Sequence, residues 1–426
     1  MFIHIVKAGE TLNDIAAMYN VSSERLISDN GVLEPNNLVV GQAIVVLIPE
    51  VIHTVTSGET IQGIASQYGL TEMELLQNNP FLTSQPELFA GETLVVSFAD
   101  EKLRNVLVNS YAYPNIEKLV LEYALPFLTQ LTIFGYGFTR SGELIGIDDE
   151  ELISKAYAFN ATPIMLLSTV DETGEFNSEI VKYIFADQEI QNNLIENIVS
   201  TMKEKGYLGL DIDFEFVAPE SRQQYIDFIR NVTNRLHAEG FTVNVDLAPK
   251  TSAEQTGLLY EAQDYKAIGE IADTVLVMTY EWGYTYGPPM AVAPLNNVKT
   301  VLNYALSEIP PEKILLGIPN YGYDWRLPYV RGESRAETIG NLQAVQRAKL
   351  FGAEIQFDEL AQTPFYTYIA PDGSEHIVWF EDARSILAKL SLVPENNLRG
   401  VGYWNTMRPF PQNWAVLNNL FEIEKT

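Results

Sequence analysis

Short apolar runs alternate with stretches of helical periodicity from about residue 105 to the end of the chain. The helical stretches, such as residues 193–206 and 222–240, repeat their apolar positions every three to four residues. The apolar runs that we interpret as buried strands are residues 105–113, 131–138, 163–169, 206–216, 241–249, 274–280, 314–322 and 400–405. Eight such strands with helices between them predict an α/β fold, a (β/α)₈ barrel over residues 103–426.

A doubly wound open sheet is the alternative α/β architecture for this pattern. It is typically accompanied by a glycine-rich phosphate-binding turn after the first strand, and the sequence offers none. The barrel is therefore the favoured interpretation. Residues 324–380 are too many for one loop, and we expect them to form a small insertion after the seventh strand.

The first hundred residues contain an internal repeat. The stretch VKAGETLNDIAAMYNV, which begins at Val6, aligns with VTSGETIQGIASQYGL, which begins 49 residues later at Val55. Each copy predicts a strand, two helices and a second strand, with Thr11 and Thr60 as the N-caps of the first helices. We therefore expect two small βααβ modules, at residues 2–48 and 51–97.

The repeated pattern GxT, IAxxY, Leu, Asn and LxxGq resembles that of LysM modules. This resemblance implies binding of glycans that contain N-acetylglucosamine, such as peptidoglycan or chitin. It places the ligand groove beside residues 9–12 and 30–36, and beside residues 58–61 in the second copy. The alternative is a pair of packing domains without a ligand.

Charge and composition limit the classes of molecule that the protein can bind. The chain has 56 acidic and 27 basic residues, a formal net charge of -29. Such a surface repels nucleic acid and anionic membranes, and no apolar window approaches the roughly 18 residues of a membrane span. The chain has no cysteine, and its four histidines form no spaced ligand pair, so we expect neither a structural zinc nor a cofactor. The N-terminus lacks the pattern of a secretory signal.

The run GYLGLDIDFEF carries acidic residues at every second position: Asp211, Asp213 and Glu215. In a strand these side chains share one face, with about 6.6 Å between neighbours. In a barrel that face is the interior, and Glu215 lies nearest the C-terminal mouth, where barrel enzymes perform their chemistry. Because three close carboxylates cannot all be charged and unpaired at neutral pH, at least one must hold a proton. The pattern predicts an acid catalyst.

Two other interpretations of this strand remain open. A solvent-exposed strand could alternate acidic and apolar residues, although the opposite face here is entirely apolar. Three carboxylates could also bind Mg²⁺ or Ca²⁺, which prefer oxygen ligands.

The same residues resemble the DGxDxDxE signature of glycoside hydrolase family 18, with Leu208 in place of its first Asp. The resemblance implies that Glu215 is the general acid, that Asp213 hydrogen-bonds the substrate N-acetyl group, and that Asp211 shares a proton with Asp213. The attacking group would be the substrate's own acetamide. A negative Asp213 is expected to raise the pKa of Glu215, and Leu208 to alter proton sharing without abolishing activity.

Residues at the ends of other predicted strands resemble those that surround the general acid in this family. Tyr280, in a variant of the family's MxYD motif, would donate its hydroxyl toward the acetamide oxygen, and Glu281 replaces the motif's Asp. Trp404 would form a floor under the sugar. Each could instead be a packing residue at the edge of the core. Further candidates for lining the site are Trp282, Tyr321 and Tyr323.

Together these features predict a retaining N-acetylglucosaminidase, monomeric and without metal or cofactor, whose LysM modules hold the glycan that the barrel cleaves. The combination resembles the cortical fragment-lytic enzymes of bacterial spores, which implies action on cortex peptidoglycan during germination and a location in the spore coat or cortex. A chitinase is the enzymatic alternative. A non-catalytic lectin or coat protein is the alternative from another class.

Overall fold

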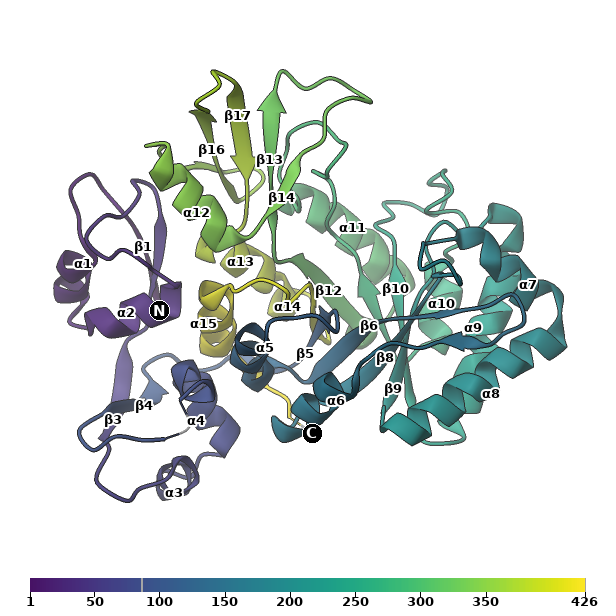
Figure 1. Cartoon of the computed structure of the whole chain (residues 1–426), viewed down its shortest axis with the longest axis horizontal. Helices are drawn as coiled ribbons and strands as arrows, with labels where there is room; N and C mark the ends of the chain where they lie inside the picture. Colours follow the sequence, from purple (N-terminus) through teal and green to yellow (C-terminus); the bar gives the residue numbers. More distant parts are fainter. Residues whose placement is uncertain (86, 426) are drawn as a thin grey trace.

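The computed structural model describes residues 1–85 and 87–425 (Figure 1). Pro86, inside the second expected module, and Thr426, the last residue of the expected barrel range, lie outside the described residues.

Eight parallel strands close into a barrel. They are β5 (Arg104–Ala112), β6 (Gln130–Phe138), β8 (Thr162–Ser168), β9 (Gly209–Asp213), β10 (Thr242–Leu247), β11 (Thr274–Val277), β12 (Ile314–Pro319) and β18 (Gly400–Trp404). The sheet runs β5-β18-β12-β11-β10-β9-β8-β6, and a pairing of β5 with β6 closes it. The predicted (β/α)₈ fold is confirmed.

Strand residues alternate between the barrel interior and the helical layer. Six inward-facing apolar side chains form an interior cluster: Leu107, Tyr111, Phe134, Leu166, Leu276 and Leu315. The outward-facing ones pack against helices α5 (Lys118–Ala124), α6 (Glu150–Ala158), α7 (Val181–Ala186), α8 (Gln188–Lys205), α9 (Arg222–His237), α10 (Tyr265–Ile271), α11 (Leu295–Glu308), α13 (Ala383–Leu390), α14 (Leu392–Glu395) and α15 (Pro411–Leu420). Two short strands, β7 (Leu144–Ile145) and β19 (Phe421–Ile423), extend the sheet.

The strands β9 and β11 each end three residues before the end of their apolar runs. β9 stops at Asp213 and β11 at Val277, so Glu215 and Tyr280 lie just beyond the ladder. The residues that follow them, Phe216 and Glu281, have φ values of 56° and 65°. This left-handed conformation is strained for a non-glycine residue and cannot continue a strand. The chain therefore turns immediately after each candidate side chain.

The insertion after the seventh strand is a separate small sheet at the top of Figure 1. Its five antiparallel strands run β14-β13-β17-β16-β15. They are β13 (Gly322–Leu327), β14 (Glu337–Ile339), β15 (Gln356–Asp358), β16 (Thr363–Ile369) and β17 (Glu375–Trp379), and helix α12 (Asn341–Leu350) packs against them.

The two N-terminal modules have the predicted βααβ order. The first contains β1 (Phe2–Ile5), α1 (Leu12–Tyr19), α2 (Ser23–Asn30) and β2 (Ala43–Val46); the second contains β3 (Pro49–Thr54), α3 (Ile61–Gln67), α4 (Glu72–Asn78) and β4 (Thr93–Phe98). Thr11 and Thr60 cap their helices as predicted. Asn30 and Asn79 make matching bonds, since each donates its side-chain amide to a helix carbonyl and to the second strand.

Both modules are fastened to the barrel by side-chain amides of α15. Gln412 donates to the Asn30 side chain at 3.0 Å and to the Ala43 carbonyl at 2.7 Å. Asn418 donates to the side chain of Asn78 at 3.0 Å. Arg25 of the first module also donates to the Asn78 carbonyl of the second. These bonds hold the two modules in fixed positions beside the barrel.

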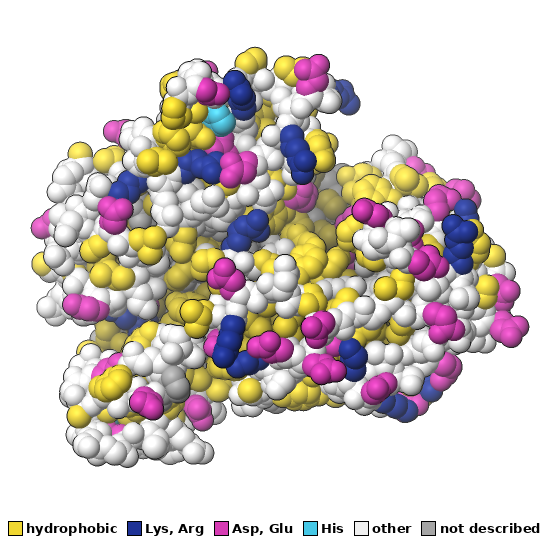
Figure 2. Space-filling model, in the orientation of Figure 1, with side chains coloured by type: hydrophobic (Ala, Val, Ile, Leu, Met, Phe, Trp, Pro, Cys, Tyr) yellow, Lys and Arg dark blue, Asp and Glu magenta, His cyan; other side chains and the backbone are white. Residues whose placement is uncertain are grey.

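Charged side chains are dispersed over the face seen in Figure 2, where Asp and Glu stand singly among Lys and Arg. Hydrophobic side chains line the hollow between the insertion and the α7–α8 side of the barrel. Within residues 1–85 and 87–425, no helix has the length and hydrophobicity that crossing a membrane requires.

Candidate active site

The predicted carboxylates lie in series along the inner face of the fourth barrel strand. Asp211 is fully buried, while Asp213 and Glu215 are partly exposed. The order along β9 therefore runs from the barrel interior to its C-terminal mouth, as the spacing predicted. Gly209, on the same face below them, has no side chain because two neighbours fill that space: a Cβ there would lie 2.5 Å from Thr242 Oγ1 and 2.7 Å from Ile164 Cδ1.

A fourth carboxylate, Asp246 on β10, joins this series and was not predicted. The Tyr111 hydroxyl on β5 lies 2.6 Å from Asp246 Oδ1 and 2.9 Å from Asp211 Oδ2, so it donates to both carboxyl groups. Asp246 could have been predicted from the sequence, because Asn244 and Asp246 also alternate with valines in a buried strand. Its contact with Tyr111 could not, because no local pattern relates the two residues.

Burial dominates the protonation of the deep carboxyl groups. It raises the pKa of Asp211 from 3.8 to about 7, although hydrogen bonds with Tyr111 and Asp246 oppose the rise. Burial, followed by the charges of Glu215 and Asp211, raises the pKa of Asp213 well above its ordinary value. Burial and the charges of Asp211 and Asp213 do the same for the pKa of Asp246. Protons are therefore shared among these groups at neutral pH.

The pKa of Glu215 is also raised, first by burial and then by the negative charge of Glu281. A raised pKa of Glu215 was expected, but the neighbouring negative charge that raises it belongs to a different residue from the one expected. Asp213 was expected to supply it. Burial and the charges of Glu215 and Asp211 raise the pKa of Asp213 itself, which favours its protonated form. After burial, the negative charge that raises the pKa of Glu215 is that of Glu281 at the mouth.

Tyr280 is buried beside the carboxylates, at the end of β11. Its ring occupies space that Gly317 leaves free, since a Cβ at Gly317 would lie 2.8 Å from Tyr280 Cε1. Burial and the charges of Asp246, Asp213, Glu215 and Glu281 raise its pKa above the ordinary value of 10.0, so the hydroxyl remains a donor.

Glu281 is held by two tyrosines from the segment after β12. The hydroxyls of Tyr321 and Tyr323 both donate to its Oε1, the latter at 3.1 Å. These bonds lower the pKa of Glu281, but the surrounding protein raises it more. The carboxylate faces solvent at the mouth, with its orientation fixed by the two phenols.

Two tryptophans border the same mouth. The Trp404 ring lies edge-on to Tyr111 and Phe134, each at 5.5 Å between ring centroids, and closes the top of the interior cluster. Trp282, next to Glu281, has a buried indole N–H without a hydrogen-bond partner among residues 1–85 and 87–425. Of the predicted side chains, Asp211 lies deep in the barrel, and Asp213 and Glu215 follow it toward the mouth. The others come from segments that follow other strands: Tyr280, Glu281, Trp282, Tyr321, Tyr323 and Trp404.

Leu208 does not belong to this network. It lies on the outward face of the strand, at the end opposite the mouth, and its side chain is 43% exposed. A carboxylate at this position would point away from Asp211 and Asp213. The expectation that Leu208 alters proton sharing was therefore wrong.

In the described part of the chain, no group of three or more His, Cys, Asp or Glu side chains has an arrangement that could hold a metal ion. The carboxyl groups are instead partnered by tyrosine hydroxyls and by one another.

The raised pKa of Asp211 predicts an unusual dependence of stability on pH. The folded protein retains this proton where the unfolded chain has lost it, so the stabilisation is complete below 3.8 and is lost as the pH rises through about 7. The thermal unfolding midpoint is expected to fall by several degrees between pH 5 and pH 8. Asp211→Asn should lessen this fall and unfold at a higher temperature than the wild type at pH 8. Calorimetry over this range measures it.

The control is Asp148→Asn, which neutralises an exposed carboxylate and should preserve the wild-type slope. Parallel curves for the wild type and Asp211→Asn would contradict the assignment of this proton.

Comparisons with known proteins identify the family of the barrel and of the two modules. Residues 112–408 match the family model described as glycosyl hydrolases family 18, and residues 4–47 and 53–97 match the LysM domain model. The chain is 40% identical to the cortical fragment-lytic enzyme of Bacillus subtilis (strain 168), over 100% of this chain and 99% of that protein.

Solved structures resemble the whole chain as well. The spore cortex-lytic enzyme SleL of Bacillus megaterium QM B1551 superposes with a TM-score of 0.84 and 37% identity, over 100% of this chain and 99% of that one. SleL of Bacillus cereus gives the same TM-score and identity, over 100% of this chain and 98% of that one.

Proposed function

The chain belongs to the glycosyl hydrolases of family 18 and carries two LysM domains before its barrel, and from this premise we propose that it is a retaining, substrate-assisted N-acetylglucosaminidase. The observation that carries the proposal is the series Asp211, Asp213 and Glu215 on the inner face of a strand that ends at the mouth of a closed barrel. Membership of the family makes the chain a glycoside hydrolase; the residue roles that follow are our assignment.

Glu215 is the general acid. It protonates the oxygen of the scissile glycosidic bond while the acetamide carbonyl oxygen of the same sugar attacks the anomeric carbon from the opposite face. The bond to the leaving sugar breaks and an oxazolinium-type ring forms. Glu215, now a carboxylate, removes a proton from the water that attacks that carbon, and the ring reopens. Two displacements leave the configuration retained.

Asp213 and Tyr280 hold the acetamide that attacks. Asp213 accepts a hydrogen bond from the acetamide N–H and stabilises the positive charge that develops on it, whereas the Tyr280 hydroxyl donates to the acetamide oxygen. Both groups are fixed before substrate arrives, by the strand ends and the space beside Gly317. Tyr111 joins Asp211 and Asp246 into a buried network. This network takes up the proton that Asp213 gives up when its carboxylate accepts from the acetamide N–H.

The residues at the rim bind the sugar. Trp404 offers an aromatic face for the apolar side of a pyranose ring. Beside Trp282, Glu281 presents an oriented carboxylate, which suits sugar hydroxyls.

The proposed substrate is the peptidoglycan of the spore cortex, cleaved in fragments during germination by protein located at the cortex or coat. Full-length similarity to proteins described as cortical fragment-lytic and spore cortex-lytic enzymes supports this choice. The two LysM domains support a glycan that contains N-acetylglucosamine.

Product analysis tests the proposal. The protein is incubated with spore-cortex fragments and, separately, with chitin oligomers, and products are identified by mass spectrometry and by the anomeric configuration first formed. We expect cleavage of cortex fragments, with N-acetylglucosamine at the new reducing ends in the β configuration. Cleavage of chitin alone would identify a chitinase. Binding of both without cleavage would identify a lectin.

The charge of Glu281 predicts a shift in the pH–activity profile. Glu281→Gln removes a negative charge that favours the protonated form of Glu215, so the pKa of Glu215 should fall. Because the acid must be protonated, the alkaline limb of kcat/KM should move to lower pH. KM should rise as well. Initial rates from pH 4 to pH 9 measure both.

Glu333→Gln, which removes an exposed carboxylate in the insertion, serves as the charge-matched control and should leave the limb in place. An unmoved limb in Glu281→Gln would mean that Glu281 does not govern the protonation of Glu215.

A further inference from the structure

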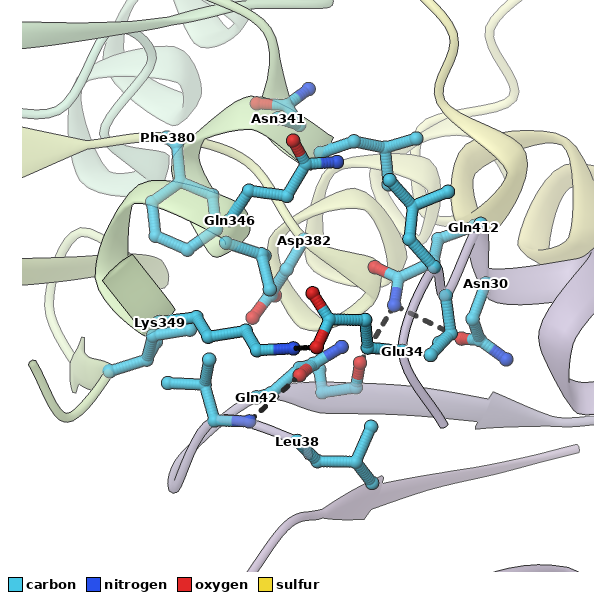
Figure 3. A pocket seen from close by; sticks show the side chains of 18 of the residues that line it. Asn30, Glu34, Leu38, Gln42, Asn341, Gln346, Lys349, Phe380, Asp382 and Gln412 are labelled. Atoms are coloured by element: carbon cyan, nitrogen blue, oxygen red, sulfur yellow. Dashed lines mark hydrogen bonds and ion pairs between the residues drawn. The ribbon is translucent and has the colours of Figure 1, made fainter. Parts of the chain in front are cut away.

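A cavity of about 470 Å³ lies between the first LysM module and the insertion of the barrel (Figure 3). The loop after α2, together with Gln42 and Ala43, forms one wall, and α12, residues 380–382 and Gln412 form the other. We propose that this cavity binds an uncharged acetamido sugar of the glycan chain, so that the module and the insertion form one composite binding site. The proposal rests on the glycan substrate proposed above and adds a second place where the protein holds it. The volume suits a small ligand, since such pockets enclose about 300–1,000 Å³.

The charges around the cavity are paired within the protein. Glu34 of the module contacts Lys349 of α12 at 2.5 Å, an ion pair that crosses the cavity and is drawn in Figure 3. Glu381 is paired with Lys389 at 2.8 Å, and Asp382 with Arg384 at 2.6 Å. On a chain with a net charge of -29, this local balance favours a neutral ligand over the charged peptides of peptidoglycan.

Polar atoms without a protein partner remain in the walls. Gln42 is only 7% exposed; its Oε1 accepts from the Val39 N–H at 3.1 Å, and its Nε2 has no partner among residues 1–85 and 87–425. Within the same described residues, Glu381, which is 1% exposed, has its Oε1 unpartnered. The Gln42 side chain lines the cavity, so its amide N–H can donate to a ligand there. The carbonyl oxygen of an acetamido group is the acceptor that Gln42 lacks.

Apolar side chains surround these polar atoms. Leu33 of the module and Leu350 of α12 stand at the rim, 72% and 75% exposed, and Leu38, Val345 and Phe380 lie deeper. An acetamido sugar combines the same two characters, because its methyl group and ring C–H bonds pack on aliphatic walls while its amide bonds to Gln42.

The cavity differs from the groove that the LysM resemblance implies. Residues 30–34 border both, but residues 9–12 do not line the cavity. Because Gln412 fixes the module to α15, and the Ile355 N–H donates to the Val40 carbonyl at 2.9 Å, the composite site has one position relative to the barrel mouth. A glycan bound there is presented to the barrel by the fold itself.

The absence of cysteine allows a direct test. Leu350→Cys, in the full chain with Glu215→Gln to prevent turnover, is labelled with an environment-sensitive fluorophore at the rim and titrated with tri-N-acetylchitotriose. We expect a saturable change in fluorescence. Gln42→Glu keeps the acceptor for Val39 but removes the amide donor, and should weaken this response at least tenfold. A fluorophore at Glu204→Cys, exposed on α8, should not respond.

Two outcomes would overturn the inference. A flat response at residue 350, while calorimetry on the same sample detects sugar binding, would place the sugar elsewhere and leave the proposed function intact. An unchanged affinity of the Gln42→Glu variant for the sugar would also place the sugar elsewhere and leave the proposed function intact. Failure of the wild-type protein to hydrolyse a small chromogenic N-acetylglucosaminide would instead contradict the proposed function itself.

Discussion

Glu215→Gln is expected to lower kcat/KM on natural glycan by about 10²–10⁴-fold, the usual contribution of a positioned general acid. Glutamine has the shape of the protonated acid but transfers no proton to the leaving oxygen. Substrates that carry a 4-nitrophenol leaving group need little protonation, so the first step should suffer much less with them. Kinetics on both substrate types measure the difference.

Misfolding cannot mimic this pattern, because the pKa of Glu215 is already raised by burial and a neutral side chain should not destabilise the fold. The unfolding temperature of Glu215→Gln should equal or exceed that of the wild type. Glu220→Gln, which changes an exposed carboxylate on the following segment, is the control and should retain activity. Equal loss on both substrate types would argue that Glu215 is not the acid.

Asp213→Asn is expected to lower kcat/KM by about 10²–10³-fold, the range found when one preorganised stabilising group is removed. The reason differs from that for Glu215. Asparagine cannot give up a proton during the reaction, so it cannot become the negative group that stabilises the positive acetamide. That attack occurs whatever the leaving group. The loss should therefore persist with 4-nitrophenyl substrates. This contrast separates the two residues in one assay.

The matched control for Asp213→Asn is Asp148→Asn, at an exposed position away from the mouth. Asp213→Asn should also remain folded, since the pKa of Asp213 is raised well above its ordinary value and the neutral amide replaces a neutral acid. If the loss vanished with an activated leaving group, Asp213 would act on proton transfer to that group and not on the acetamide.

Local sequence patterns predicted much of this protein. Apolar runs gave the eight barrel strands, and Thr11 and Thr60 cap their helices as the repeat implied. The apolar runs overestimated the length of two strands, because β9 and β11 end at Asp213 and Val277, shortly before Phe216 and Glu281 adopt positive φ values. No propensity predicts such a conformation for phenylalanine or glutamate; the surrounding structure imposes it.

The sequence likewise predicted some residues of the candidate site and not others. Asp211, Asp213 and Glu215 could be placed on one face because the side chains of a strand alternate with a period of two. Asp246 carried the same signal and was overlooked. Leu208 was misjudged although the same alternation assigns it to the other face.

The sequence by itself determined the features that depend on neighbours along the chain: the strand and helix periods, the caps, the repeated modules and the shared face of the three carboxylates. Only the tertiary structure decided which groups set their protonation. Tyr111 meets Asp211 across 100 residues and Asp246 across 135, and Glu281 reaches Glu215 from another strand end. Closure of the barrel creates these contacts and removes the water around them, and burial is the largest cause of every raised pKa in the site. A local pattern contains neither the distant partner nor the lost solvent.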